Sequence, residues 1–183
     1  MIRRAARVAD RIHAKQRRKG NGQPYILHPI RVAGRVATLE VATDEMVAAA
    51  FLHDVIEDSE DRSAVEEMLN REFNEQVVNL VFELTAPSAF MDKHKTTREH
   101  RKMCDREHYV GSSKEAKIIK LCDRIDNVLE MQGLNQDFQR IYLRESYELL
   151  EVLRGAHEPL GHLLKQYCDD QNWLLEGDHD TVR

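Results

Sequence analysis

The sequence predicts an all-α protein built as a single domain. The chain has 183 residues, which suits one domain with a sizeable core. It contains only 8 Gly and 4 Pro, so the turn signals of a β-rich fold are scarce. Apolar residues recur at helical spacing along most of the chain, and no segment keeps up the alternation of a strand. We therefore expect one helical domain over residues 1–175 and a frayed tail over residues 176–183.

The first part of the chain holds three helix patterns. Residues 3–18 carry one apolar face and end before a glycine-containing loop. Pro29 suits the first position of a second helix, where its missing N–H costs no hydrogen bond. Residues 44–57 are apolar nearly all round, which predicts a third helix at the centre of the core.

The remainder of the chain predicts further helices and one irregular segment. Ser63 with Glu66, and Ser112 with Glu115, have the spacing of capping boxes that start helices. Apart from the helix opened by Ser63, we expect helices over residues 75–85, 112–131, 138–154 and 156–171. The polar, highly charged residues 87–111 are expected to form a loop or a mobile helical excursion, which would cover a site or gate substrate entry.

Charge and cysteine content narrow the class of protein. The net charge of −5 and pI of about 6.0 argue against a surface that wraps duplex nucleic acid. No stretch approaches the roughly 20 apolar residues of a membrane span. The basic N-terminus lacks the apolar region of a secretory signal, and an Arg-rich transit peptide is the alternative. The odd set Cys104, Cys122 and Cys168 has no CxxC spacing, which favours a reducing, cytoplasmic setting.

Four ionisable residues interrupt the apolar segment FLHDVIED at residues 51–58. His53, Asp54, Glu57 and Asp58 have the spacing i, i+1, i+4 and i+5, which puts them on one side of a helix. Burying these groups costs several kcal/mol unless something compensates. A divalent metal compensates, because it binds neutral imidazole and carboxylate oxygen. The alternative is a surface helix whose acidic side faces water.

Two other segments offer further metal ligands. In PYILHPI, His28 precedes a proline and is therefore held extended, although a capping or core histidine also explains it. In KIIKLCDRIDNV, Asp123 and Asn127 lie four residues apart on an expected helix. The alternative for Asp123 is a salt bridge to Lys120 or Arg124. Together the three segments supply two imidazoles and two carboxylates, which is a ligand set for one divalent cation.

These segments resemble a known family. A distant His, an adjacent His-Asp pair and a later Asp are the signature of HD-domain metal-dependent phosphohydrolases, which fold as a helical bundle. RRKGNGQPYILHPIRVA, AAFLHDVIEDS and AKIIKLCDRIDNV are most similar to the hydrolase domain of the Rel/Spo alarmone enzymes and to the stand-alone small alarmone hydrolases. The resemblance runs from about residue 5 to residue 155.

The resemblance implies roles for ten residues. One metal ion, Mn²⁺ in this family, would be bound by His28, His53, Asp54 and Asp123. The attacking water would be held and activated by Glu57 and Asp58. The nucleotide would be bound by Arg18, Lys19, Tyr25 and Asn127, with the two basic residues on phosphates, Tyr25 against the base and Asn127 near the ribose.

The implied reaction is hydrolysis of the 3′-pyrophosphate of alarmone nucleotides. The substrate would be (p)ppGpp or its adenosine analogues, and the products pyrophosphate and GDP or GTP (ADP or ATP). A metal lowers the pKa of water, a nearby carboxylate accepts its proton, and Arg and Lys neutralise phosphate. The alternative for Arg18 and Lys19 is a solvated basic helix end. The chain ends before a synthetase domain, so we expect hydrolysis without synthesis.

Some positions depart from the family pattern. Leu129 stands where Arg is usual, Cys122 where Ala is common, and Asp126 where an apolar or aromatic residue is usual. The loop around Gly20–Gly22 also differs slightly in length. These departures leave the metal ligands untouched, and they leave the base and the number of 5′ phosphates open.

Two alternatives for the function stay open, and neither the motifs nor the composition gives an oligomeric state. The first is an HD-type nucleotidase that acts on other nucleotides. The second is a catalytically silent module that only binds a nucleotide. A second metal is a further possibility, because His94, His100 and His108 fall between the His-Asp pair and Asp123.

Overall fold

The computed structural model describes residues 1–177 of the chain. Within them the helices follow one another in the order α1 (Ile2–His13), α2 (Leu27–Ala37), α3 (Asp44–Leu52), α4 (Arg62–Glu72), α5 (Glu75–Leu84), η1 (Pro87–Phe90), α6 (Arg98–Gly111), α7 (Lys114–Leu129), η2 (Met131–Gly133), α8 (Gln136–Leu153), η3 (Arg154–Ala156) and α9 (Glu158–Gly177). The extended pairing in this part of the chain is an isolated bridge between Arg17 and Pro24. The prediction of an all-α fold is confirmed.

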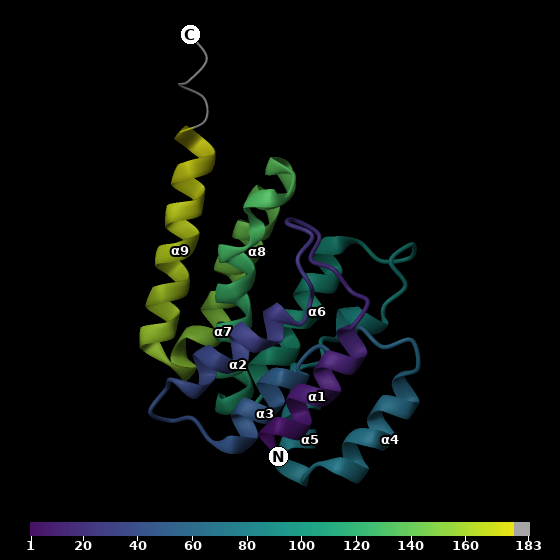
Figure 1. Cartoon of the computed structure of the whole chain (residues 1–183). Helices are drawn as coiled ribbons and strands as arrows, with labels where there is room; N and C mark the ends of the chain where they lie inside the picture. The colour runs from purple at the N-terminus through teal and green to yellow at the C-terminus, as the bar shows by residue number, and fades with distance from the viewer. Residues whose placement is uncertain (178–183) are drawn as a thin grey trace.

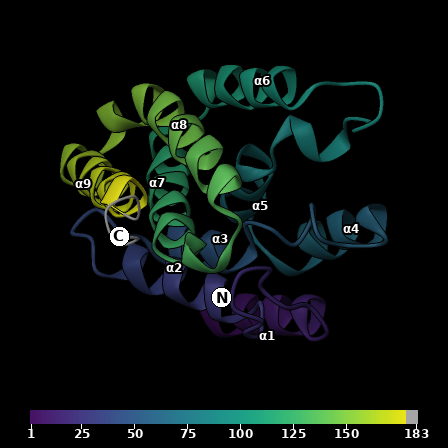
Figure 2. The same cartoon turned by 90° about the horizontal axis from the view of Figure 1, so that it is seen from above.

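Two helices organise the core. Helix α3 packs against α1, α2 and α5, and helix α7 packs against α2, α5, α8 and α9. Figure 2 shows α1 and α6 at opposite edges of the molecule with α3 and α7 between them, and Figure 1 shows α8 and α9 standing side by side. The predicted central position of the third helix is confirmed, because Met46, Leu52 and the alanines of α3 are at most 1% exposed.

Helix α3 ends at Leu52, five residues before the predicted end at residue 57. The imidazole Nδ1 of His53 lies 2.8 Å from the carbonyl oxygen of Ala50, which a continuing helix would offer to the backbone N–H of Asp54. Residues 53–57 therefore form successive turns, held by a bond from the Asp58 N–H to the Asp54 oxygen (2.9 Å). The predicted helical stripe of four ionisable groups is wrong, and the chain presents His53 and Asp54 separately from Glu57 and Asp58.

The first helix also ends earlier than predicted, at His13 instead of residue 18. Arg18 and Lys19 consequently lie in the loop between α1 and α2, so they are not a basic helix end. This loop is closed by the Arg17–Pro24 bridge, and it turns at Gly22, whose φ of 69° is left-handed. At Gly133 a Cβ would lie 2.2 Å from the carbonyl oxygen of Gly20, so the loop and η2 meet backbone to backbone.

Several predicted helix starts are displaced by one or two residues. The N-cap of α4 is Asp61, whose side chain accepts from the Ala64 N–H, and not Ser63. The N-cap of α7 is Ser113, while Ser112 ends α6. Helix α2 begins at Leu27, two residues before Pro29. Asp61 and Ser113 are polar residues close to the predicted caps, whereas α2 begins after Ile26 without a side-chain cap.

The charged segment 87–111 contains more regular structure than a loop. It forms η1 and then α6, whose N-cap Thr97 accepts from the His100 N–H at 3.2 Å. Helix α6 packs against α8 and η1, and the buried Tyr109 donates to the Leu84 oxygen at 2.9 Å. The helical part of the expectation for this segment is therefore confirmed.

The last helix runs further than predicted. Helix α9 includes Glu176 and Gly177, and the remainder of the expected frayed tail lies outside the described residues. Between residues 1 and 177, no helix has the length and apolar character that crossing a membrane requires. The thiols of Cys104, Cys122 and Cys168 are free.

Candidate metal centre and adjoining pocket

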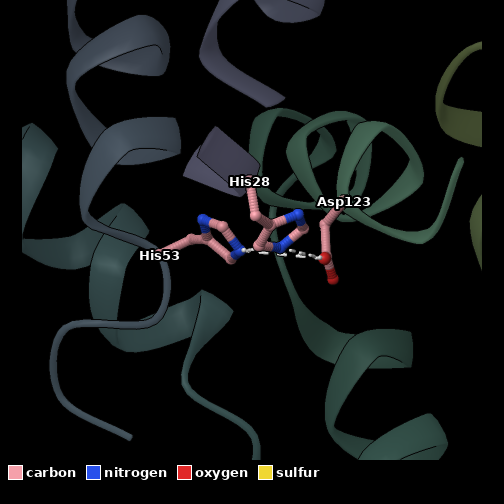
Figure 3. Close-up of side chains that lie close together, drawn as sticks. All are labelled: His28, His53 and Asp123. Carbon is pink, nitrogen blue, oxygen red and sulfur yellow. Dashed lines mark hydrogen bonds and ion pairs between the residues drawn. The ribbon is translucent and has the colours of Figure 1, made fainter. Parts of the chain in front are cut away.

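Three buried side chains from separate helical segments meet at one point. His28 lies in the first turn of α2, His53 directly follows α3, and Asp123 lies on α7. The Nε2 atoms of the two histidines are 3.2 Å apart, and Asp123 Oδ1 is 3.1 Å from the Nε2 of His28. Figure 3 shows both imidazoles turned toward each other and toward the carboxylate. All three side chains are at most 3% exposed.

A contact at Nδ1 fixes the orientation of each imidazole. Nδ1 of His28 lies 2.6 Å from Asp126 Oδ2, and Nδ1 of His53 lies 2.8 Å from the Ala50 carbonyl oxygen. A carboxylate and a carbonyl only accept, so both Nδ1 atoms carry the proton and donate. Burial lowers the pKa of both imidazoles, but the surrounding carboxylates outweigh it and raise this pKa above its ordinary value. When the imidazoles are neutral, each Nε2 directs its lone pair at the meeting point, which is the tautomer that binds a metal.

Asp123 presents one oxygen to the centre and the other to a lysine. Its Oδ2 lies 2.7 Å from Lys120 Nζ, so the salt bridge weighed as an alternative exists alongside the contacts with the histidines. Its Oδ1 accepts from the Asn127 side-chain amide at 2.5 Å. Burial alone would raise the pKa of Asp123, but Lys120 and the two imidazoles hold this pKa well below its ordinary value.

Asp54 borders the same point. Its Oδ2 is 3.0 Å from the Nε2 of His53 and 3.6 Å from the Nε2 of His28. The same oxygen accepts from the Tyr25 hydroxyl at 2.6 Å. Burial opposes ionisation of Asp54, but the neighbouring His53 outweighs it and lowers the pKa of Asp54 below its ordinary value.

This donor set fits a divalent metal ion. Two neutral imidazole nitrogens and two carboxylate oxygens suit first-row divalent cations. The centre also has the right size, because ligands about 2.1 Å from one ion and at right angles lie roughly 3 Å apart. The contacts between donor atoms here span 3.0–3.7 Å. In the part of the chain that the structure describes, His28, His53 and Asp123 are the group that could hold an ion.

Glu57 and Asp58 diverge after Asp54. Glu57 Oε1 accepts from the Ala86 N–H at 2.7 Å, which points this side chain toward the start of η1. Burial, reinforced by the charge of Asp54, raises the pKa of Glu57 to about 7. The side chain of Asp58 is 33% exposed, and its Oδ2 lies 3.6 Å from Nδ1 of the buried His13. Burial of its carboxyl and the charge of Asp54 also raise the pKa of Asp58.

An apolar pocket of about 240 Å³ adjoins the centre at Tyr25 and Asn127, which line the pocket and contact Asp54 and Asp123. Its polar lining includes all four residues predicted to bind substrate: Arg18, Lys19, Tyr25 and Asn127. Its apolar lining includes Met131, Leu134, Phe138 and Tyr142. Arg18 donates to the Asn127 side-chain oxygen at 2.8 Å, and Asn127 in turn donates to Asp123. A continuous chain of hydrogen bonds therefore links the basic loop to the centre.

The histidines considered for a second metal do not come together with the centre. His108 contacts the Glu83 carbonyl oxygen at 2.7 Å, and His100 lies 3.8 Å from the Cys104 sulfur. His94 is exposed in the turn before α6. None of the three belongs to a possible metal group within residues 1–177.

Sequence reasoning missed the role of Asp126. We noted it only as a departure from the family pattern, yet it is 2% exposed and accepts from both His28 and Arg31. Its spacing of three residues after Asp123 was a usable signal, because residues three apart on a helix share a face. The other departures differ: Cys122 is buried in the core, and Leu129 is 36% exposed.

The fold and this centre define an all-helical domain built around a buried group of side chains that could hold a divalent metal ion. Residues 5–157 match the HD domain family, and the chain belongs to that family.

Relatives and a solved structure agree with this placement. The human protein MESH1, named guanosine-3′,5′-bis(diphosphate) 3′-pyrophosphohydrolase, is 34% identical over 174 residues, which cover 88% of this chain and 92% of MESH1. A Synechocystis protein named as a probable enzyme of the same activity is 37% identical over 155 residues, or 84% of this chain. This chain spans about a fifth of the length of that relative and of one from Aquifex aeolicus. A structure described as a metazoan ortholog of SpoT that hydrolyzes ppGpp superposes with a TM-score of 0.79, at 29% identity, over 93% of this chain and 94% of the other.

Proposed function

We propose that this protein hydrolyses the 3′-pyrophosphate of guanosine alarmones such as ppGpp, and that it uses one divalent metal. The observation that carries the proposal is the convergence of His28, His53 and Asp123, with Glu57 close by at a pKa near 7. The similarity to MESH1 along 92% of that protein supports the choice of substrate. A metal bound here would polarise a phosphoryl oxygen and lower the pKa of water.

The residues of the chain supply the remaining steps. Glu57 takes a proton from the attacking water, because a carboxyl with a pKa near 7 is balanced between its two forms at neutral pH. The water oxygen bonds to the phosphorus attached to O3′, and the O3′–P bond breaks. Pyrophosphate leaves with that oxygen, and O3′ takes up a proton as a hydroxyl. Asp58 orients the water from the exposed side.

The nucleoside is assigned to the apolar pocket beside the centre. Tyr25 and Phe138 offer aromatic faces to a base, and Asn127 stands between Arg18 and Asp123, where a ribose would meet it. Arg18 and Lys19 offset phosphate charge. We propose Mn²⁺ as the ion, with Asp54 as a fourth ligand. Zn²⁺ and Fe²⁺ compete for the same donors by the usual affinity order.

The first experiment is a product assay. The purified protein is incubated with ppGpp, pppGpp, their adenosine analogues and a panel of deoxynucleoside monophosphates, with Mn²⁺ or with EDTA, and the products are separated by anion exchange. We expect metal-dependent release of GDP or GTP with pyrophosphate. Hydrolysis of the monophosphates in preference to the 3′-pyrophosphates would indicate a general nucleotidase. Tight binding without turnover would indicate a silent binding module.

Three variants separate metal binding from chemistry. His53→Ala and Asp123→Ala should lose bound metal and activity together. Glu57→Ala should lose activity and still bind metal, since Glu57 contacts a backbone N–H and not the centre. Normal hydrolysis by Glu57→Ala would show that the water is activated by another group.

A further inference from the structure

Asp58 lies in a segment that no helix holds in place. Helix α3 ends at Leu52, and residues 53–57 form turns before the bend at Asp58. The preceding Glu57 accepts from the Ala86 N–H at 2.7 Å, at the start of η1. The side chain of Asp58 is instead 33% exposed and lies beside the end of α1. The placement of Asp58 therefore depends on contacts that α1 provides.

Two residues at the end of α1 make these contacts. His13 is the last residue of α1 and is 1% exposed. Its Nδ1 lies 2.7 Å from Gln16 Oε1 and 3.6 Å from Asp58 Oδ2. An amide oxygen and a carboxylate both accept, so Nδ1 carries the proton and donates to Gln16. Gln16 Nε2 in turn donates to the backbone oxygen of Asp58 at 3.2 Å. His13 thus acts on Asp58 through Gln16 and also faces its carboxylate directly.

The backbone of Gln16 is itself held on both sides. Its N–H donates to the His13 oxygen at 3.0 Å, and its oxygen accepts from the Tyr25 N–H at 3.0 Å. The Tyr25 ring lies against the His13 ring with the ring centroids 4.8 Å apart. The Gln16 amide that contacts Asp58 therefore extends from a fixed backbone.

Stability alone does not explain a histidine at position 13. Its Nε2 is buried and has no hydrogen-bond partner in the part of the chain that the structure describes. A buried polar atom without a partner lowers stability, whereas an apolar side chain of the same shape would not. Such an atom in a native structure calls for an explanation, and the contacts of Nδ1 with Gln16 and Asp58 provide one.

We propose that His13 is a positioning residue for the hydrolysis, because it holds the Asp58 carboxylate at the angle at which Asp58 orients the attacking water. The proposal rests on the proposed function, which assigns that water to Glu57 and Asp58. His13 itself belongs neither to the lining of the apolar pocket nor to the group that could hold a metal. A change at His13 should therefore affect the chemical step and leave the binding of substrate and metal unchanged.

The test is a double-mutant cycle between positions 13 and 58. His13→Phe keeps a ring against Tyr25 and removes both nitrogens. With ppGpp and Mn²⁺, this variant should lower kcat by roughly tenfold or more, because displacing a group near the reacting atoms has an effect of this size. Its KM and its affinity for Mn²⁺ should stay within about twofold of the wild type. In an Asp58→Asn background the same substitution should lower kcat by less than about twofold, because the group that it positions is already altered.

Two further variants separate positioning from a general effect on α1. His13→Asn should recover part of kcat, because its amide N–H replaces the N–H at Nδ1. Val8→Ala is the matched structural control, since Val8 is 4% exposed and belongs to the hydrophobic core on the same helix. This control should lower the free energy of unfolding and leave kcat within about twofold of the wild type.

The outcomes are distinguishable from failure of the proposed function. Equal fractional losses of kcat from His13→Phe in the two backgrounds, or an equal loss from Val8→Ala, would overturn the proposal. If the wild type hydrolyses no 3′-pyrophosphate, the proposed function fails, and urea unfolding of the same four proteins decides whether His13 holds Asp58. Coupled unfolding free energies would support that contact, and additive ones would overturn it. If His13→Phe does not fold, Gln16→Met removes the amide between the two residues and takes its place in the cycle.

Discussion

Asp126 is expected to control metal affinity without touching the metal. Its carboxylate holds Nδ1 of His28 at 2.6 Å and is itself held by Arg31 Nε at 2.6 Å and by the same guanidinium at 3.0 Å. Asp126→Asn keeps the shape of the side chain and removes its charge. The imidazole then loses part of its basicity, so its binding to the metal weakens.

The expected size of the effect follows from the kind of contact. Loss of a carboxylate that orients a metal-bound histidine lowers metal affinity by about 10- to 100-fold, or about 1.4–2.8 kcal/mol. The effect of the unpaired Arg31 on stability should be smaller, because the side chain of Arg31 is 32% exposed and water screens its charge.

The assay is a titration of the protein with Mn²⁺, followed by the loss of the electron paramagnetic resonance signal of the free ion. Glu130→Gln is the matched control. It lies on the same side of the structure, makes the same change of charge and contacts the same Arg31 at 3.5 Å, but it does not touch His28. The control should bind Mn²⁺ within about twofold of the wild type. Wild-type affinity in Asp126→Asn would refute the argument that Asp126 prepares His28 for the metal.

Three further predictions concern stability. Burial raises the pKa of Glu57 from 4.5 to about 7, so the folded wild type binds a proton more tightly than the unfolded chain and loses stability as pH rises through that window. Metal-free Glu57→Gln should therefore be more stable than the metal-free wild type by up to about 3 kcal/mol at pH 8 and by almost nothing near pH 4.5. Urea unfolding midpoints that are equal for the two proteins at both pH values would contradict this. Saturating metal at 100 times its Kd should add about 2.7 kcal/mol and raise Tm by roughly 5–10 °C, whereas Tm independent of EDTA would argue against a metal centre. Gly133→Ala should lower Tm clearly more than Gly155→Ala, because a Cβ at position 133 would meet the Gly20 oxygen at 2.2 Å while position 155 opens to free space.

The fold was largely predictable because helical periodicity and the all-apolar character of α3 are local signals. The ends of the helices were less predictable. The end of α3 at Leu52 depends on the His53 ring taking the carbonyl oxygen of Ala50, and the displaced starts depend on which of several adjacent polar residues becomes the cap.

The candidate site also has parts that the sequence predicts and parts that it does not. The predicted ligands His28, His53 and Asp123 lie together, and their identification needed only the motifs and their order. The support from Asp126 depends on tertiary packing of α2 against α7, which the motif does not encode.

The two imidazoles differ in whether a substitution can change the group that holds them. His28 is oriented by a side chain, so single substitutions at position 126 can retune its basicity and with it the preference among metals. His53 is oriented by the backbone oxygen of Ala50, which every amino acid at position 50 would supply. A point mutation at the partner residue can thus change the basicity of His28, whereas no such mutation removes the hydrogen-bond partner of His53. Drift among descendants of this protein should therefore alter the His28 side of the centre first.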